Sequence, residues 1–219
     1  MARPKVPLIS KRETLEVALR IIDEEGIDAL NIRRLAAEFG VNGASFYYHF
    51  NNKDEILAGA AELALDDVRT PRDTGEDWRE WLLRNAQMYR KALLSHPDLI
   101  MVMLRRGRLR IGLRRLDTSV KRLEQQGVPT EATAALVEAL EIFAIGSALA
   151  EAHGAVDTQV PPEYPSLQRA LDQRGLSVEG NFDIACRGII NAIADTFGLA
   201  PAPAPAKARR GTKKAATGR

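Results

Sequence analysis

The stretch NIRRLAAEFGVNGASFYYHFNNK, residues 31–53, has the pattern of two short helices joined by a tight turn. Asn31 can cap the first helix by accepting a hydrogen bond from a free backbone N–H group. The apolar residues of that helix recur at helical spacing and predict one buried face: Ile32, Leu35, Ala36 and Phe39. Gly40 can adopt the left-handed backbone conformation that ends a helix. The stretch therefore predicts a helix-turn-helix, a motif whose second helix enters the DNA major groove.

The second helix of this motif combines apolar and hydrogen-bonding side chains. Phe46 and Phe50 lie four residues apart, so both can point into the same core. The remaining positions carry donors that can meet a phosphate oxygen or a base edge: Ser45, Tyr47, Tyr48 and His49. The alternative interpretation is a buried aromatic cluster with solvated polar neighbours.

The predicted DNA contacts are of two kinds. Tyr48 and Lys53 are assigned to the phosphate backbone, and the N-terminus of the helix that Lys53 opens adds to the attraction for phosphate. Arg33 and Ser45 are assigned nearer the bases. The whole predicted set is Arg33, Gly43, Ala44, Ser45, Tyr47, Tyr48, His49 and Lys53.

Helix signals on both sides of the motif complete a small domain. Ser10 and Glu13 form a capping box that opens a helix ending at Gly26. Downstream, Asn51 or Asn52 is expected to cap another helix. These elements predict a three-helix DNA-binding domain.

The first 69 residues resemble the DNA-binding domain of the TetR family of bacterial transcriptional repressors. The residues that carry the resemblance are an aromatic pair before a histidine and an Asn–Lys helix start: Tyr47, Tyr48, His49, Phe50, Asn52 and Lys53. Residues 75–98, 146–154 and 165–175 extend it to the subgroup typified by the tetracycline repressor. The resemblance implies a homodimer that binds a palindromic operator in double-stranded DNA and responds to a small organic effector.

The rest of the chain shows helical periodicity without convincing strand alternation, so the expected fold class is all-α. We predict a helix-turn-helix domain at 1–53, a connecting helix at 54–69, and a helical effector-binding and dimerisation domain at 70–199. Residues 200–219 are rich in Ala, Pro and basic residues and are predicted to be disordered. Within the larger domain, Leu109 is expected to begin one helix and Asn181 to cap the last.

Composition sets the outer limits on function. The 219 residues carry a formal net charge of only +2, which alone says little about nucleic acid. We identify no run of about 18 apolar residues and no signal peptide, so a cytoplasmic protein without a membrane partner is expected. Cys186, the only cysteine, is interpreted as a small buried apolar residue, with a reactive redox thiol as the alternative.

Two helical segments look too apolar to face water on one side. Residues 130–153 offer small side chains, and residues 181–197 offer large ones, namely Ile184, Ile189, Ile190 and Ile193. Such faces can pack closely in a four-helix bundle between two copies of the chain. An intramolecular core is the alternative.

The resemblance also assigns an effector pocket. Asn85 matches a drug-contacting asparagine of the tetracycline repressor, and Tyr89 takes the place of a pocket phenylalanine. Met103 stands where that repressor has a metal-binding histidine, and a thioether is a poor ligand for Mg²⁺. We therefore expect no metal site, no cofactor and a largely apolar effector. Arg106, in the arginine-rich segment 105–115, is predicted to meet an anionic or carbonyl group of the effector, unless that segment is simply a solvated face.

An enzyme is not expected. The three histidines do not join a nucleophile in any catalytic motif, and there is no phosphate-binding glycine loop. The sequence predicts a ligand-responsive DNA-binding transcriptional regulator, specifically a repressor released from its operator by the effector. The alternative from a different class is a ligand-independent architectural DNA-binding protein.

Overall fold

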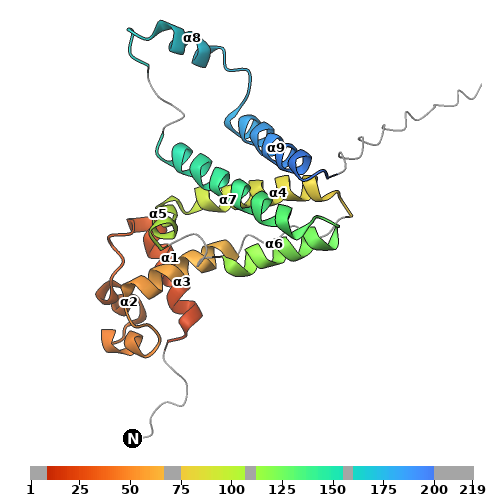
Figure 1. Cartoon of the computed structure of the whole chain (residues 1–219). Coiled ribbons are helices and arrows are strands. Elements are labelled where there is room, and N and C mark those ends of the chain that lie inside the picture. The colour runs from red at the N-terminus through yellow and green to blue at the C-terminus, as the bar shows by residue number, and fades with distance from the viewer. Residues whose placement is uncertain (1–8, 67–74, 107–111, 155–159, 200–219) are drawn as a thin grey trace, which may run out of the picture.

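The computed structural model describes residues 9–66, 75–106, 112–154 and 160–199, and all regular structure within these ranges is helical (Figure 1). The N-terminal elements are α1 (Lys11–Glu25), α2 (Ile32–Phe39), the 3-10 helix η1 (Gly43–Tyr48) and α3 (Lys53–Asp66). The larger domain contains α4 (Trp78–Ser95), α5 (Pro97–Arg106), α6 (Leu113–Gln125), α7 (Thr130–Ala152), α8 (Pro165–Asp172) and α9 (Val178–Thr196). The predicted all-α fold is confirmed.

Side-chain caps define the helices of the N-terminal domain. The backbone N–H of Glu13 donates to Ser10 Oγ at 3.1 Å, and that of Arg34 donates to Asn31 Oδ1 at 2.8 Å. Asn52 rather than Asn51 caps α3, because Asn52 Oδ1 accepts from the N–H of Glu55 at 2.9 Å. The Glu55 carboxylate in turn accepts the N–H of Asn51, the residue before the cap, so the arrangement resembles a capping box displaced by one residue.

The core of this domain lies where α1, α2, η1 and α3 meet. Its fully buried side chains include Ile21, Ile22, Leu35, Phe46 and Phe50. The predicted inward faces of both helices of the motif are therefore confirmed for Leu35, Phe46 and Phe50.

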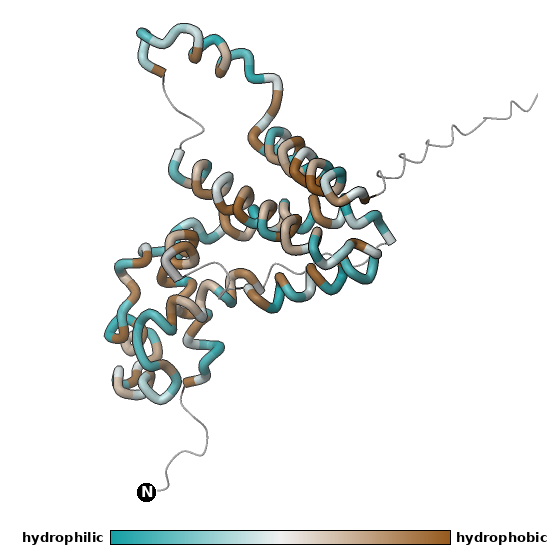
Figure 2. Tube along the Cα trace, in the orientation of Figure 1, coloured by the Kyte–Doolittle hydropathy of each residue, from teal (hydrophilic) through white to brown (hydrophobic). Residues whose placement is uncertain are grey.

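The larger domain is organised around α4 and α7. Helix α7 packs against α4, α6 and α9, and Trp81, Leu136 and Ile190 are buried among them. Figure 2 shows hydrophobic residues along both α7 and α9, which run side by side. Helix α8 projects away from this body, and none of its residues is buried (Figure 1).

Helix α7 is long and apolar enough to span a membrane by length and composition. The sequence prediction overlooked it, because it counted uninterrupted apolar residues and α7 contains scattered acidic ones. The contacts with four other helices, α4, α5, α6 and α9, identify α7 as the central core helix of this domain.

Two predicted helix starts are wrong. Helix α9 begins at Val178, where Ser177 Oγ accepts the N–H of Gly180 at 3.0 Å, so Asn181 lies inside the helix. The cap was predicted wrongly because Ser177, four residues before Asn181, also carries a side-chain oxygen that can accept this hydrogen bond. Helix α6 begins at Leu113, after Gly112 in the left-handed conformation, rather than at Leu109.

Some expectations fall outside the described residues. These are the end of the connecting segment at Arg69, the side chain of Arg106 and the tail at 200–219.

Gly40 provides a test of the turn between α2 and η1. Its φ of 61° and ψ of 32° place it in the left-handed region, where its N–H donates to the carbonyl of Ala37. We expect Gly40→Val to lower the free energy of unfolding by about 1–2 kcal/mol, because a branched side chain is strained there. Gly40→Asn, the control, should cost less because asparagine tolerates this conformation. Urea unfolding followed by circular dichroism would contradict this account if both variants had the wild-type midpoint.

Candidate nucleic-acid interface and internal cavity

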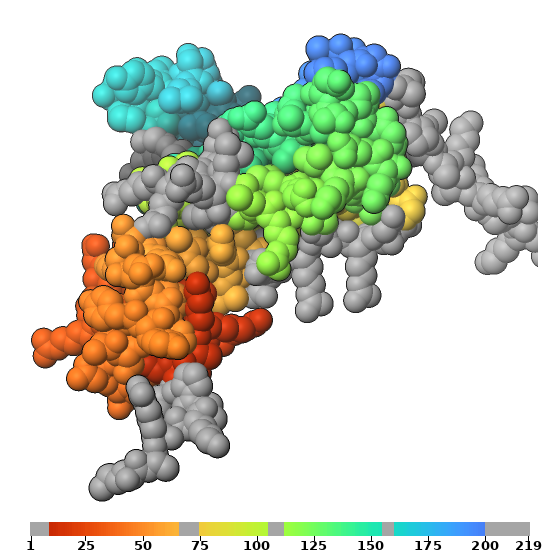
Figure 3. All heavy atoms as spheres, turned by 60° about the horizontal axis from the view of Figure 1, so that its bottom comes forward, coloured from red at the N-terminus to blue at the C-terminus, as the bar shows by residue number. Residues whose placement is uncertain are grey.

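The outward side of η1 presents two aromatic rings to solvent. Tyr48 is 86% exposed and Tyr47 is 62% exposed, and Ala44 and Ser45 beside them are also exposed. Phe46 and Phe50 point the other way into the core. In Figure 3 the red and orange atoms of the N-terminal domain form a lobe at one end of the molecule. The predicted side chains are therefore available to a partner on this lobe.

Gly43 and His49 bound η1 and shape it. A Cβ atom at Gly43 would lie 3.1 Å from Ile32 Cγ2, so glycine lets the start of η1 approach α2 closely. His49 ends η1, its backbone N–H donating to the carbonyl of Phe46, and its half-buried ring packs edge-on against Tyr48. Gly43 thus contributes through backbone shape, and His49 also orients Tyr48.

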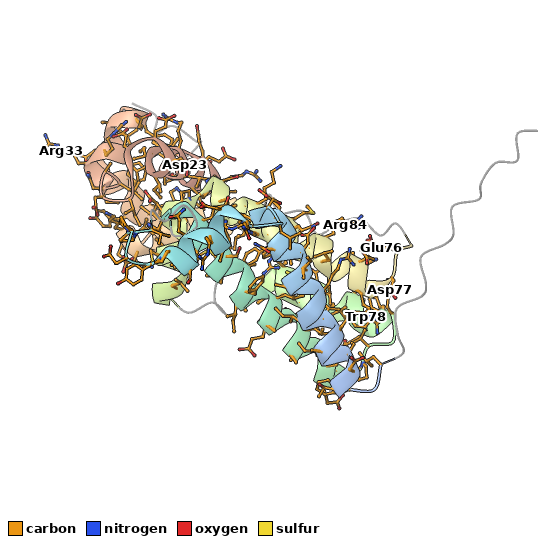
Figure 4. All side chains as sticks on the ribbon, turned by 90° about the horizontal axis from the view of Figure 1, so that it is seen from above. Asp23, Arg33, Glu76, Asp77, Trp78 and Arg84 are labelled. Atoms are coloured by element: carbon orange, nitrogen blue, oxygen red, sulfur yellow. The ribbon has the colours of Figure 1, made fainter. Side chains whose placement is uncertain are left out.

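The adjacent arginines of α2 have different surroundings. Arg34 forms ion pairs with Glu25 on α1, at 2.6 Å, and with Glu38. Arg20 on α1 also binds Glu38, and the hydrogen bonds from Arg20 and Arg34 lower the pKa of that carboxyl. Arg33 is exposed and points away from the body (Figure 4). Arg34 therefore joins α1 to α2, and Arg33 is the one placed to reach a partner.

Lys53 occupies the first position of α3, on the same lobe as η1. Its side chain is half-buried, and Nζ donates to the carbonyl oxygen of Ile27 at 3.5 Å. That distance is at the limit for a hydrogen bond, so the ammonium group can exchange this contact for a stronger anionic acceptor.

A small cavity, partly open to solvent, lies between α4, α6 and α7. Its volume is about 10 Å³, which is space for about one water molecule. Its lining consists of Leu82, Asn85, Ala86, Tyr89, Arg115, Val137, Leu140 and Glu141. Of the predicted effector residues, the fold brings Asn85 and Tyr89 together here. Met103 is buried on α5, which packs against α4 and α7, but it does not line the cavity.

The lining is more polar than the sequence predicted. Arg115 lies 3.2 Å from Glu141, and both side chains are buried. The Arg115 guanidinium also lies 4.1 Å from the centre of the Tyr89 ring, and the Tyr89 hydroxyl donates to Glu141 at 3.3 Å. Sequence reasoning missed Glu141, although its position three and seven residues before Ala144 and Ala148 places it on the buried face of α7.

Two polar atoms at this cavity have no hydrogen-bond partner in the described structure. They are Oδ1 of Asn85, an acceptor, and Nε of Arg115, a donor. Buried polar groups are usually satisfied, so these two atoms indicate a missing partner at this place.

Other candidate chemistry is not supported by the surroundings. Burial raises the pKa of the Cys186 thiol to about 12, and the side chain is fully buried, as predicted for a structural cysteine. Among the described residues, no three His, Cys, Asp or Glu side chains are grouped so that they could hold a metal ion.

Comparison with known proteins agrees with both halves of the structure. The family described as "Bacterial regulatory proteins, tetR family" matches residues 15–60, and "Tetracyclin repressor-like, C-terminal domain" matches residues 70–182. The class A tetracycline repressor of Escherichia coli is 29% identical over 175 residues, which cover 72% of this chain and 77% of that repressor. The class E repressor of the same organism is 27% identical over 195 residues, covering 83% and 89%.

Solved structures show the same architecture. ActR of Streptomyces coelicolor in complex with actinorhodin has a TM-score of 0.70 at 25% identity, covering 87% of this chain and 99% of ActR. A TetR variant of Acinetobacter baumannii AYE in complex with minocycline has a TM-score of 0.69 at 25% identity, covering 84% and 92%. The related proteins are transcription regulators rather than enzymes. With its helix-turn-helix lobe and its tetracycline-repressor-like helical domain, this chain belongs to the TetR family of DNA-binding transcriptional regulators with a ligand-binding C-terminal domain.

Proposed function

We propose that this regulator is a cytoplasmic repressor that binds a palindromic operator as a homodimer and leaves it when a small organic effector occupies the cavity. The observation that carries the proposal is the combination of an exposed aromatic helix-turn-helix lobe with a separate cavity containing unpartnered polar atoms. The relatives solved with actinorhodin and minocycline support a small-molecule effector.

On the DNA side, Tyr48 and Lys53 contact phosphates, and Arg33 and Ser45 reach the bases. Gly43 and Ala44 allow the backbone of η1 to enter the groove closely, and Tyr47 and His49 complete the surface. On the effector side, Asn85 and Tyr89 contact the ligand directly. Met103 supports α5 behind them, and Arg106 meets an anionic or carbonyl group of the effector.

The proposed release depends on the spacing of two recognition elements. In a dimer they must lie about 34–36 Å apart to enter successive major grooves. Helix α3 contacts both α1 and α5, so a shift of α3 moves the lobe relative to the larger domain. The effector must bind the DNA-incompetent arrangement more tightly, because otherwise it shifts nothing.

The dimer is proposed to form through the open sides of α7 and α9. Ile142 on α7 is 49% exposed and Ile184 on α9 is 57% exposed. A Cβ atom built at Gly146 or Gly188 would have no described heavy atom within 4 Å, so a partner helix can approach closely. Ile189 and Ile193 pack against the core and Ile190 is buried, so these three are not the exposed residues of the interface. The exposed Leu167 of α8 and Tyr164, the residue before α8, offer further apolar contact.

A ligand-independent architectural protein is the second candidate, because the cavity in this structure holds only about one water molecule. Competition of a labelled promoter fragment with palindromic and scrambled DNA separates the two. A specific repressor should prefer its palindrome by about 10³-fold or more. Equal competition by scrambled DNA would favour the architectural role.

Lys53 tests the docking of the lobe. We expect Lys53→Ala to weaken binding to all DNA sequences and to reduce the salt slope of log K by about one unit, because one phosphate contact is lost. Fluorescence anisotropy over a salt series measures both quantities. Lys91→Ala, at an exposed lysine of α4, is the control and should behave as wild type. An unchanged affinity and slope for Lys53→Ala would show that the lobe docks differently.

Gly146 and Ile184 test the assembly. We expect Gly146→Arg and Ile184→Arg to place an arginine in the dimer contact, at a cost of several kcal/mol, and to yield monomers with poor operator binding. Gln125→Arg, on the exposed end of α6, is the control. Sedimentation velocity reports the outcome, and dimers that persist in both variants would place the interface elsewhere.

A further inference from the structure

We propose that Arg115 is the anchor for an acidic group of the effector, and that the Arg115–Glu141 ion pair holds the cavity closed until that group replaces Glu141. The proposed ligand class is a hydroxy acid, with a carboxylate or comparable anion for Arg115 and an adjacent hydroxyl for Asn85. The inference rests on the proposed function, because it specifies the chemistry of the effector that the cavity accepts.

The first step is the incomplete pairing of a buried cation. Arg115 is more than nine-tenths buried, yet its recorded ion pair uses one guanidinium nitrogen, at 3.2 Å from Glu141, and Nε remains without a partner. A guanidinium presents donors in a planar fork that a carboxylate can bind with two parallel hydrogen bonds. The Nε–H group of Arg115 is therefore available to a ligand at the cavity.

The second step is the matching acceptor on α4. Asn85 is nine-tenths buried, and its Oδ1 has no partner. Both atoms belong to residues that line the same cavity. A ligand that satisfies them needs an acceptor for Arg115 and a donor for Asn85, and a carboxylate beside a hydroxyl supplies the two together.

The third step is the choice of an anion over a cation. Glu141 also accepts from the Tyr89 hydroxyl, so it keeps a hydrogen bond when Arg115 turns to the ligand. Arg115 keeps its contact with the face of the Tyr89 ring in the same exchange. The unpartnered Arg115 atom, Nε, is a donor and needs an acceptor, which an anionic ligand supplies and a cationic ligand does not.

The exchange also has a path to the DNA-binding lobe. Arg115 lies in the first turn of α6, and a Cβ atom at Gly112, which caps α6, would lie 3.4 Å from Leu65 of α3. Release of Arg115 from Glu141 removes the ion pair that joins the first turn of α6 to α7. Helix α3 touches that start, so the movement reaches the helix that carries the lobe.

The test uses three matched probes: 3-hydroxy-2-naphthoate, its methyl ether and its carboxamide. Isothermal titration of the full-length protein should show the hydroxy acid binding about 10-fold tighter or more than either analogue, a difference that corresponds to one lost charge-assisted or buried hydrogen bond. Equal affinities for the three probes, or no binding by any of them, would overturn the inference.

Variants then assign the discrimination to residues. Arg115→Met combined with Glu141→Gln removes both charges, so no buried charge is left alone, and it should abolish the preference for the acid over the carboxamide. Asn85→Leu should abolish the preference for the hydroxyl over the methyl ether. Arg114→Met, at the exposed neighbour on α6, is the control and should keep both preferences. If the double variant folds, as circular dichroism reports, and still prefers the acid, Arg115 is not the anchor.

Operator release is measured separately with the same probes. Release by the carboxamide as readily as by the acid would overturn the acidic anchor and leave the proposed repressor intact. Tight binding of the acid without preference for a palindromic operator would instead contradict the repressor while retaining the anchor.

Discussion

Helix α3 is the constraint on which the two halves of the molecule depend, because it belongs to both cores. On one side Gly59 of α3 faces Leu15 of α1 so closely that a Cβ atom there would lie 2.7 Å from the leucine side chain. On the other side α3 packs against α5 and α4. A second link joins α1 to the start of α5, where His96 Nδ1 lies 2.9 Å from Asp23. Both α1 and α3 thus hold the lobe against the larger domain, and a displacement of α3 must be transmitted to the lobe.

Charge is distributed differently in the two domains. In the lobe, Arg20 and Arg34 share Glu38 at the surface, where ion pairs add little stability but orient α2 relative to α1. In the larger domain, the buried Arg90 binds Ser147 and Glu151 of α7, and Arg115 binds Glu141 of the same helix. Glu151 is 31% exposed, whereas both members of the Arg115–Glu141 pair are buried. A buried ion pair is expensive to desolvate, so the Arg115–Glu141 pair is better explained by specificity of packing or by ligand recognition than by stability.

The described cavity and the exposed rings of η1 are complementary features of a regulator. Tyr47 and Tyr48 expose rings of a kind that can pack on sugar or bind phosphate, and Phe46 and Phe50 behind them fix the backbone that carries them. The cavity, in contrast, is nearly filled in this structure. The side chains that fill it also join α4, α6 and α7. Opening the cavity would therefore change how these three helices pack.

Short-range signals in the sequence were sufficient for the fold class and for most of the motif. The cap at Asn31, the turn at Gly40 and the inward pair Phe46 and Phe50 depend on hydrogen bonds and spacing within a few residues, and all four are found as predicted. Asn181 failed as a cap because Ser177 offered an equivalent acceptor nearby, and local signals do not rank two such candidates.

Only the tertiary structure decided which charged residues meet inside the molecule. Arg115 and Glu141 are 26 positions apart and lie on different helices, so their pairing depends on how α6 and α7 cross over Tyr89. The sequence showed an arginine-rich segment and a mostly apolar helix, and each was consistent with a solvated face or a simple core. A charged side chain is stable in water but costs free energy when it is buried without a partner. Whether a side chain is buried depends on contacts between distant parts of the chain, which a local sequence pattern does not specify.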